Sequence, residues 1–275
     1  MKRREFILLL GSAVAWPLVV RAQQSGVRLI GYLSSRSPGD SADIVAAFRQ
    51  GLKDSGFVDG QNVSIEARFA SGNFDRLPEL ASDLVRRQVS VIVATGGTVS
   101  VVKAKPVVPR TIPIVFAMGG DPVKLGVVGS LNRPGDNVTG VAFLVNGLST
   151  KQIELLHHLL PNARAVGFLV NPKDPNAASD VKDAREAADA FGQKLVVGEA
   201  STEDEIQSAI TAFAQQQAAG LFVDAEPFLL DEHKKIIELA AQCRLPVVSQ
   251  FRSLAGGRSI CNCKEFASLH LGTIF

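Results

Sequence analysis

The sequence predicts a two-lobed α/β protein in which each lobe contains a parallel sheet covered by helices. Strand-like and helix-like patterns alternate along the chain from residue 27, and the second half repeats their order at a nearly constant offset. The strand "IPIVFA" of the first half also has a counterpart, "LPVVSQ", in the second. Alternating strands and helices form parallel sheets with helices on both faces, and a repeat of this kind indicates two similar units.

The first half alternates four strand-like segments with three helix-like segments. Residues 41–57 carry apolar side chains at helical spacing and stop at Gly56, a typical helix end. Residues 62–69 alternate apolar and polar side chains as a half-buried strand does, whereas residues 89–95 form the apolar run of a strand buried on both faces. The expected strands are residues 27–33, 62–69, 89–95 and 112–117, and the expected helices are residues 41–57, 74–88 and 98–105.

The second half follows the same order, with "AVGFLVN" matching "LIGYLSS" and "AGLFVDAEP" matching "VSVIVATGG". We expect a strand near the hinge at residues 137–143, strands at residues 165–171, 194–200 and 245–250, a strand with its loop at residues 219–227, and helices at residues 179–192, 202–216 and 229–243. The expected division is a signal peptide (1–22), an N-terminal α/β lobe (23–120), a crossover or hinge region (121–145), a C-terminal α/β lobe (146–257) and an atypical tail (258–275).

The first 22 residues have the order of an export signal. "MKRREF" is basic, an apolar stretch follows, and small residues at Val20 and Ala22 fit a cleavage site. The stretch is shorter than the roughly 20 residues that a membrane-spanning helix needs. Arg3 and Arg4 resemble a twin-arginine signal, and general secretion stays open as the alternative. The sequence therefore predicts export to the periplasm after removal of a cleavable signal peptide.

Composition excludes several classes of protein. The formal net charge is +2, and the basic excess lies in residues 1–22, so nothing indicates nucleic-acid binding. Cys261 and Cys263 are separated by one residue, which suits neither an easy disulfide nor the usual zinc spacing. No nucleophile, metal-ligand set or cofactor loop is visible. We therefore expect no cofactor, no metal and no enzymatic activity.

Several longer segments resemble the periplasmic substrate-binding proteins of ABC transporters, in a branch related to proteins that bind tryptophan and other aromatic amino acids. The resemblance covers residues 1–257 and includes "RREF…RAQQ", "IGYLS", "FRQGLKDSGFVDGQNVSIEARFA", "TIPIVFAMGGDPV", "LNRPGDNVTGV", "IELLHHLLPNARAVGFLVNP" and "LPVVSQFR". It implies two Rossmann-like lobes of the type I periplasmic binding protein kind, hinged around a cleft. It also implies a monomer that captures a small solute and delivers it to an ABC permease in the inner membrane.

The resemblance ends near Arg258. "RSICNCKEFASLHLGTIF" follows, without a sustained strand or helix period. We interpret this tail as the product of a truncation or frameshift and expect it to pack poorly. Alternative interpretations are a short member of the family with a different tail, a defective binding protein, or an exported two-lobed sensory domain.

Ligands of such sheets bind at the carboxyl ends of the strands, and this rule selects the candidate residues of the first lobe. The "TGGT" loop at residues 95–98 can present backbone N–H groups to a carboxylate, although Thr98 could equally be a helix cap. Asp121 could accept an ammonium group or cap a helix that begins at Pro122 and Val123, and the serines could bind ligand or belong to a solvated turn. The candidates are Ser34, Ser35, Thr95, Gly96, Gly97, Thr98, Met118 and Asp121.

The second lobe contributes Asn171, Asp224 and Glu226 to the predicted site. The two acids follow a predicted strand and suit the amino group of a ligand. Such a pair could also indicate acid–base catalysis, but no histidine or nucleophile lies in a comparable loop. We therefore expect an amino acid or similar small zwitterion, and the resemblance alone favours an aromatic side chain.

Overall fold

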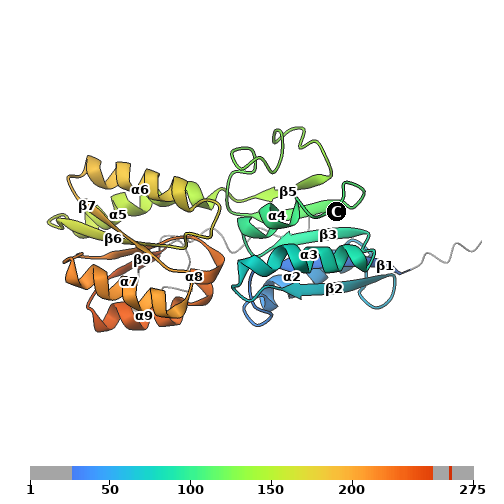
Figure 1. Ribbon diagram of the computed structural model, residues 1–275, viewed down its shortest axis with the longest axis horizontal. Coiled ribbons are helices and arrows are strands. Elements are labelled where there is room, and N and C mark those ends of the chain that lie inside the picture. The colour runs from blue at the N-terminus through green and yellow to red at the C-terminus, as the bar shows by residue number, and fades with distance from the viewer. Residues whose placement is uncertain (1–26, 250–259, 262–275) are drawn as a thin grey trace, which may run out of the picture.

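The computed structural model describes residues 27–249 and 260–261, which form two α/β lobes side by side (Figure 1). The first lobe contains β1 (Arg28–Ser34), α2 (Ala42–Asp54), β2 (Val63–Phe69), α3 (Leu77–Arg86), β3 (Val91–Thr95), α4 (Thr98–Ala104), β4 (Ile114–Met118) and β5 (Val138–Ala142). The second contains α5 (Ser149–Leu159), β6 (Ala165–Val170), α6 (Ala177–Ala190), β7 (Lys194–Glu199), α7 (Glu203–Gln215), β8 (Leu221–Val223), α8 (Pro227–Asp231), α9 (His233–Gln242), β9 (Val247–Ser249) and β10 (Ile260–Cys261).

The two sheets have the same topology. Their strand orders are β2-β1-β3-β4-β5 and β10-β9-β8-β6-β7, so β1 to β5 correspond in order to β6, β7, β8, β9 and β10. Every strand pair is parallel. This agreement confirms the fold class expected from the repeated sequence pattern, because equivalent patterns occupy equivalent places in the two sheets.

Aromatic and aliphatic side chains pack between each sheet and its helices. In the first lobe, Tyr32 packs against Phe48 and Phe69, with ring centroids 5.5 and 6.0 Å apart. In the second lobe, Phe168 and Phe222 are register partners whose rings stack at 4.7 Å. Helices α5 and α6 lie on one face of that sheet and α7 and α9 on the other (Figure 1). These layers hold the strand ends in fixed positions.

The expected helix over residues 229–243 begins earlier and is divided. Helix α8 starts at Pro227 because the Glu226 side chain accepts hydrogen bonds from the backbone N–H groups of Phe228 and Leu229, at 2.9 and 2.6 Å. The α-helix is interrupted at Glu232 before α9. Glutamate is not among the preferred N-cap residues, which explains why the sequence pattern missed this start.

Two expectations fall near the borders of the predicted domains. Strand β5 lies in the predicted crossover region and pairs with β4, so it extends the first sheet. Ile260–Cys261 pairs with β9 as β10, although the tail has no strand period.

The signal peptide and the remainder of the tail lie outside the described residues, and the domain division stays a prediction. Within residues 27–249 and 260–261, no helix has the length and apolar character needed to cross a membrane.

Candidate ligand-binding site

A cavity of about 430 Å³ lies between the lobes at the carboxyl ends of strands from both sheets. Its first-lobe wall follows β1, β3 and β4, and its second-lobe wall follows β6 and β8. The lining residues are Arg36, Ile44, Thr95, Gly96, Gly97, Thr98, Ala117, Met118, Gly119, Phe143, Val145, Asp174, Ala225, Glu226, Pro227 and Leu230. The sequence therefore predicted six of the lining residues, namely Thr95, Gly96, Gly97, Thr98, Met118 and Glu226.

The loop after β3 owes its shape to two glycines with positive φ. Gly96 has φ +77°, and an added Cβ would lie 2.5 Å from the Ser34 hydroxyl. Gly97 has φ +115°, and an added Cβ would overlap the ring of Pro227 in the opposite lobe. Gly97 is the N-cap residue of α4, and the Thr98 hydroxyl instead accepts a hydrogen bond from the backbone N–H of Gly120 at 3.0 Å. The loop thus brings backbone close both to the cavity and to the other lobe.

Thr95 places a buried hydroxyl in the cavity wall. Its Oγ1 has no hydrogen-bond partner among the described residues. Burial raises the pKa of the nearby Tyr32 hydroxyl and Thr95 lowers it, yet the two oxygens do not meet with hydrogen-bond geometry. A buried hydroxyl without a partner is unfavourable, and a polar ligand atom in the cavity would satisfy it.

Three first-lobe candidates do not line the cavity. Ser34 and Ser35 are buried beneath the Gly96 loop, where Ser34 contacts the Ser41 hydroxyl at 3.4 Å and the Ser35 hydroxyl donates to the Gly96 carbonyl. Asp121 accepts backbone hydrogen bonds from Val123 and Lys124, at 2.8 and 3.2 Å. The serines therefore support the loop. Asp121 accepts from the backbone as the capping alternative expected, but residues 122–126 form a turn and not the expected helix.

Glu226 is one of two buried acids that line the cavity. It is almost fully buried, and its oxygens accept from two backbone N–H groups and from the Asn171 amide at 3.4 Å. Burial, reinforced by the negative charge of Asp174, raises the pKa of Glu226 to about 8. Asn171 does not line the cavity, so it positions the Glu226 carboxyl group through this hydrogen bond from outside the lining.

Asp224 precedes the lining residues Ala225 and Glu226 but does not itself line the cavity. Its Oδ1 accepts from the Ala225 N–H at 2.8 Å, but Oδ2 is buried without a hydrogen-bond partner among the described residues. Burial raises the pKa of Asp224 well above its ordinary value, and the neighbouring carboxylates of Asp180 and Asp174 raise it further. This side of the site therefore favours protonated acids or a nearby cation.

The sequence analysis missed Asp174 and Arg36. Asp174 lines the cavity and accepts two hydrogen bonds from Asn176, at 2.7 and 2.8 Å, while burial raises its pKa. Arg36 lines the opposite wall and pairs with Asp231. Both residues follow the first strand of their lobe, in "SSR" and "NPKD", so the rule about strand ends could have included them.

The remaining wall is apolar. Ile44, Met118, Phe143, Val145, Pro227 and Leu230 all line the cavity. These side chains come from both lobes and the segment between them. The cavity therefore combines polar and acidic groups with room for an apolar body, a combination typical of small-molecule sites.

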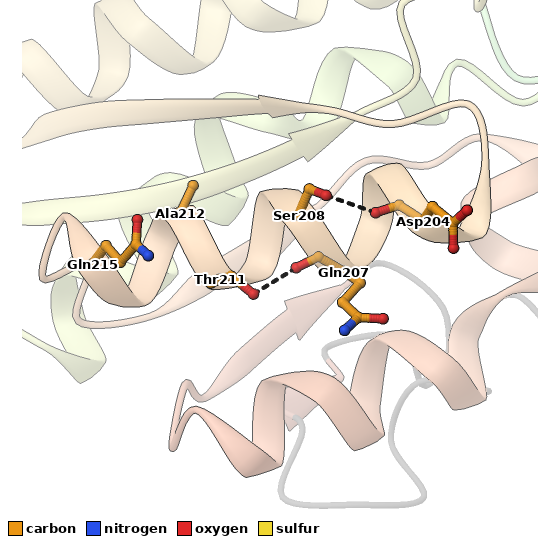
Figure 2. A pocket seen from close by; sticks show the side chains of 6 residues that line it. All are labelled: Asp204, Gln207, Ser208, Thr211, Ala212 and Gln215. Carbon is orange, nitrogen blue, oxygen red and sulfur yellow. Dashed lines mark hydrogen bonds between the residues drawn. The ribbon is translucent and has the colours of Figure 1, made fainter.

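A second hollow has none of these properties. It runs along α7 and is lined only by Asp204, Gln207, Ser208, Thr211, Ala212 and Gln215 (Figure 2). The hydroxyls of Ser208 and Thr211 donate to carbonyls of their own helix, at 2.9 and 2.8 Å. A single polar helix face without converging groups is a solvated surface. Within the part of the chain that the structure describes, no cluster of His, Cys, Asp or Glu is suited to a metal ion.

Two parallel-sheet lobes around one cavity define a type I periplasmic binding fold. The chain belongs to the family of ABC transporter substrate-binding proteins, and the sequence model of that family matches residues 38–257.

Two solved structures have similar lobes. A conserved domain protein from Vibrio cholerae is 27% identical with a TM-score of 0.72, and the match covers 85% of this chain and 77% of the other. The ABC domain in complex with L-Trp from Streptococcus pneumonia is 21% identical with the same TM-score, covering 84% of this chain and 77% of the other. The second likeness concerns the fold alone.

A curated relative is the tyrosine-binding protein of Clostridioides difficile strain R20291. It is 26% identical over 215 residues, which is 78% of this chain and 61% of the relative. The chain therefore spans less than two thirds of that relative's length. The family and this relative are both described by what they bind.

The buried carboxylate of Glu226 predicts how stability changes with pH. The folded protein holds a proton on Glu226 up to about pH 8, whereas the unfolded chain releases it near the ordinary value of 4.5. Because the folded state binds the extra proton between these values, the free energy of unfolding should fall as pH rises from 4.5 to 8. Glu226→Gln cannot titrate, so its stability should improve relative to wild type over this window, on the order of a few kcal/mol.

Urea unfolding of both proteins from pH 4 to 9 measures this difference. Two stability curves that stay parallel across the window would show that Glu226 has an ordinary pKa in the folded protein. Asp121→Asn serves as a control for loss of a capping carboxylate outside the cavity.

Proposed function

We propose that the protein is the periplasmic solute-binding component of an ABC importer and captures an amino acid between its lobes. The observation that carries this proposal is the cavity itself, with buried acids on one wall, an unpartnered hydroxyl on the other and apolar side chains between them. Membership of the ABC transporter substrate-binding family supports delivery to a membrane permease.

The ammonium group of the ligand is assigned to Glu226 and Asp174. Both acids line the cavity, and the basic side chains nearest to this edge have other partners: Arg36 pairs with Asp231 and Lys173 with Asp75. An ammonium would therefore supply the positive charge that the two buried carboxyl groups need in order to ionise. The buried carboxyl group of Asp224, which interacts with both acids, would add to the attraction for the ammonium.

The carboxylate of the ligand is assigned to the first-lobe wall. Thr95 lines the cavity and carries a hydroxyl that can donate a hydrogen bond, and the Gly96–Gly97 backbone can approach a ligand closely because it carries no side chains. Arg36 lines the same wall, with its charge paired to Asp231. A zwitterion would thus lie across the cavity with opposite ends against opposite lobes.

An aromatic side chain fits the remaining space. Met118 and Phe143 offer polarisable and aromatic contacts, and the cavity volume of about 430 Å³ lies within the range of small-molecule pockets. The relative from Clostridioides difficile is a tyrosine-binding protein, and one similar fold was determined with L-Trp. These observations favour tyrosine or tryptophan over small aliphatic amino acids.

Calorimetry with L-tyrosine, L-tryptophan, L-leucine and benzoate tests the ligand class. Thr95→Val removes one hydrogen bond to a charged group, so it should weaken binding roughly tenfold or more. Glu226→Gln leaves the ammonium poorly compensated and should weaken binding roughly 100-fold. Asp121→Asn should stay within about twofold of wild type, because Asp121 lies outside the cavity lining. Tight binding of benzoate without any amino acid would refute the zwitterion assignment.

Binding of an ammonium should also release a proton. At pH 7 the free protein holds a proton on Glu226, whose pKa is about 8, and a cation beside it favours the ionised form. The calorimetric enthalpy at pH 7 should therefore differ between phosphate and Tris buffers, in proportion to buffer ionisation. Glu226→Gln should reduce this difference. Equal enthalpies in both buffers for the wild type would contradict ammonium binding at Glu226.

Export is proposed from the first 22 residues and from the family. N-terminal sequencing of protein recovered from a periplasmic extract should begin at Gln23. Blocking either export route separately would distinguish general secretion from twin-arginine export. A membrane-bound product that begins at Met1 would contradict a cleavable signal.

A further inference from the structure

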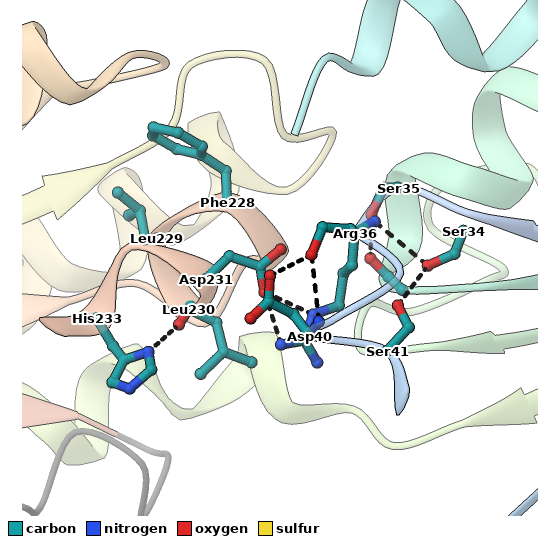
Figure 3. A network of polar contacts seen from close by, with 12 residues as sticks. Ser34, Ser35, Arg36, Asp40, Ser41, Phe228, Leu229, Leu230, Asp231 and His233 are labelled. Atoms are coloured by element: carbon teal, nitrogen blue, oxygen red, sulfur yellow. Dashed lines mark hydrogen bonds and ion pairs between the residues drawn. The ribbon is translucent and has the colours of Figure 1, made fainter. Parts of the chain in front are cut away.

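One ion pair joins the two lobes directly beside the ligand cavity. Arg36 follows β1 in the first lobe, and Asp231 ends α8 in the second. The Nε and one terminal nitrogen of Arg36 lie 2.7 and 2.6 Å from the same Asp231 oxygen. Figure 3 shows these side chains meeting between elements from opposite halves of the sequence.

The pair separates two hollows. Arg36 lines the ligand cavity, whereas Asp231 does not. Asp231 instead lines a polar groove of about 420 Å³ between the lobes, together with Ser37, Asp40 and Glu232. The ion pair therefore stands between the ligand cavity and this groove, where separation of the lobes would break it.

The surroundings make this pair sensitive to loss of either partner. The side chains of Arg36 and Asp231 are only 15% and 12% exposed. Burial raises the pKa of Asp231, Asp40 raises it further, and the hydrogen bond and charge of Arg36 oppose this effect. Removing one partner of such a pair leaves a poorly hydrated charge without compensation.

A second ion pair between the lobes provides a natural comparison. Lys173 and Asp75 lie 3.0 Å apart, but their side chains are 47% and 65% exposed. Water and salt screen exposed pairs, which contribute little. The two pairs join the same lobes and differ mainly in burial.

We propose that Arg36 and Asp231 form a latch that holds the lobes closed over the ligand, so that Asp231 sets the ligand's residence time without touching it. This proposal rests on the proposed function in that the ligand occupies the cavity between the lobes. The latch exists only when the lobes are together, so its loss lowers the population of the closed form. The effect should therefore be found mainly in the dissociation rate.

Dissociation of radiolabelled L-tyrosine from the full chain tests the latch. Asp231→Asn should accelerate dissociation about 10- to 100-fold with little change in the association rate. Asp231→Glu keeps the charge and should remain closer to wild type. Asp75→Asn, which breaks the exposed pair, should stay within about twofold. Arg36→Gln combined with Asp231→Asn should be no worse than Arg36→Gln alone, because both changes break one interaction.

Small-angle X-ray scattering separates failure of the latch from failure of the proposed function. In the ligand-free protein, Asp231→Asn should increase the radius of gyration relative to both wild type and Asp75→Asn, with unchanged circular dichroism. If the wild type binds no amino acid, the ligand assignment fails while scattering still decides the latch. An Asp231→Asn protein that matches wild type in scattering, and in dissociation where binding occurs, would overturn the latch. If the Asp231→Asn protein does not fold, both measurements pass to Arg36→Lys, which loses the contact of two nitrogens with one Asp231 oxygen and should shift less in the same direction. Wild-type behaviour of Arg36→Lys would then overturn the latch.

Discussion

The strands of a parallel sheet all run in the same direction, so their carboxyl ends lie at one edge. The candidate site depends on this constraint in both lobes. The ends of β1, β3 and β4 bring Arg36, Thr95 and Met118 to one wall of the cavity, and the ends of β6 and β8 bring Asp174 and Glu226 to the other. Each wall is incomplete as a site for a zwitterion. Only the apposition of the two edges places a hydroxyl, acids and apolar side chains around one space.

The acidic wall shows how the fold tolerates buried carboxyl groups. Glu226 caps α8 through two backbone N–H groups and also receives the Asn171 amide. These hydrogen bonds fix the carboxyl group at the cavity edge, but burial and the charge of Asp174 still favour its protonated form. The same residue therefore caps a helix and provides a buried titratable group at the cavity.

Contact between the lobes depends on residues that leave room for side chains of the opposite lobe. An added Cβ at Gly97 would overlap Pro227, and one at Gly120 would overlap the Asn176 side-chain oxygen. The lobes can approach closely at these glycines because no side chain intervenes. The Arg36–Asp231 pair then lies at the flank of this contact, where its low exposure distinguishes it from the Lys173–Asp75 pair. Shape and charge thus both act where the two lobes meet.

The sequence by itself determined the alternation of strands and helices, the repetition of one topology and the loops at the strand ends. These features depend on periodicity and on neighbours along the chain, such as the apolar run before Thr95 and the glycines after it. The tertiary structure decided which side chains in those loops face the cavity. Ser34 and Asp121 turned to local partners, whereas Asp174 and Arg36 reached the cavity wall. The Arg36–Asp231 contact joins residues 195 positions apart, and no local pattern records such a distance. Pairing and burial of this kind arise only when the two lobes are packed together.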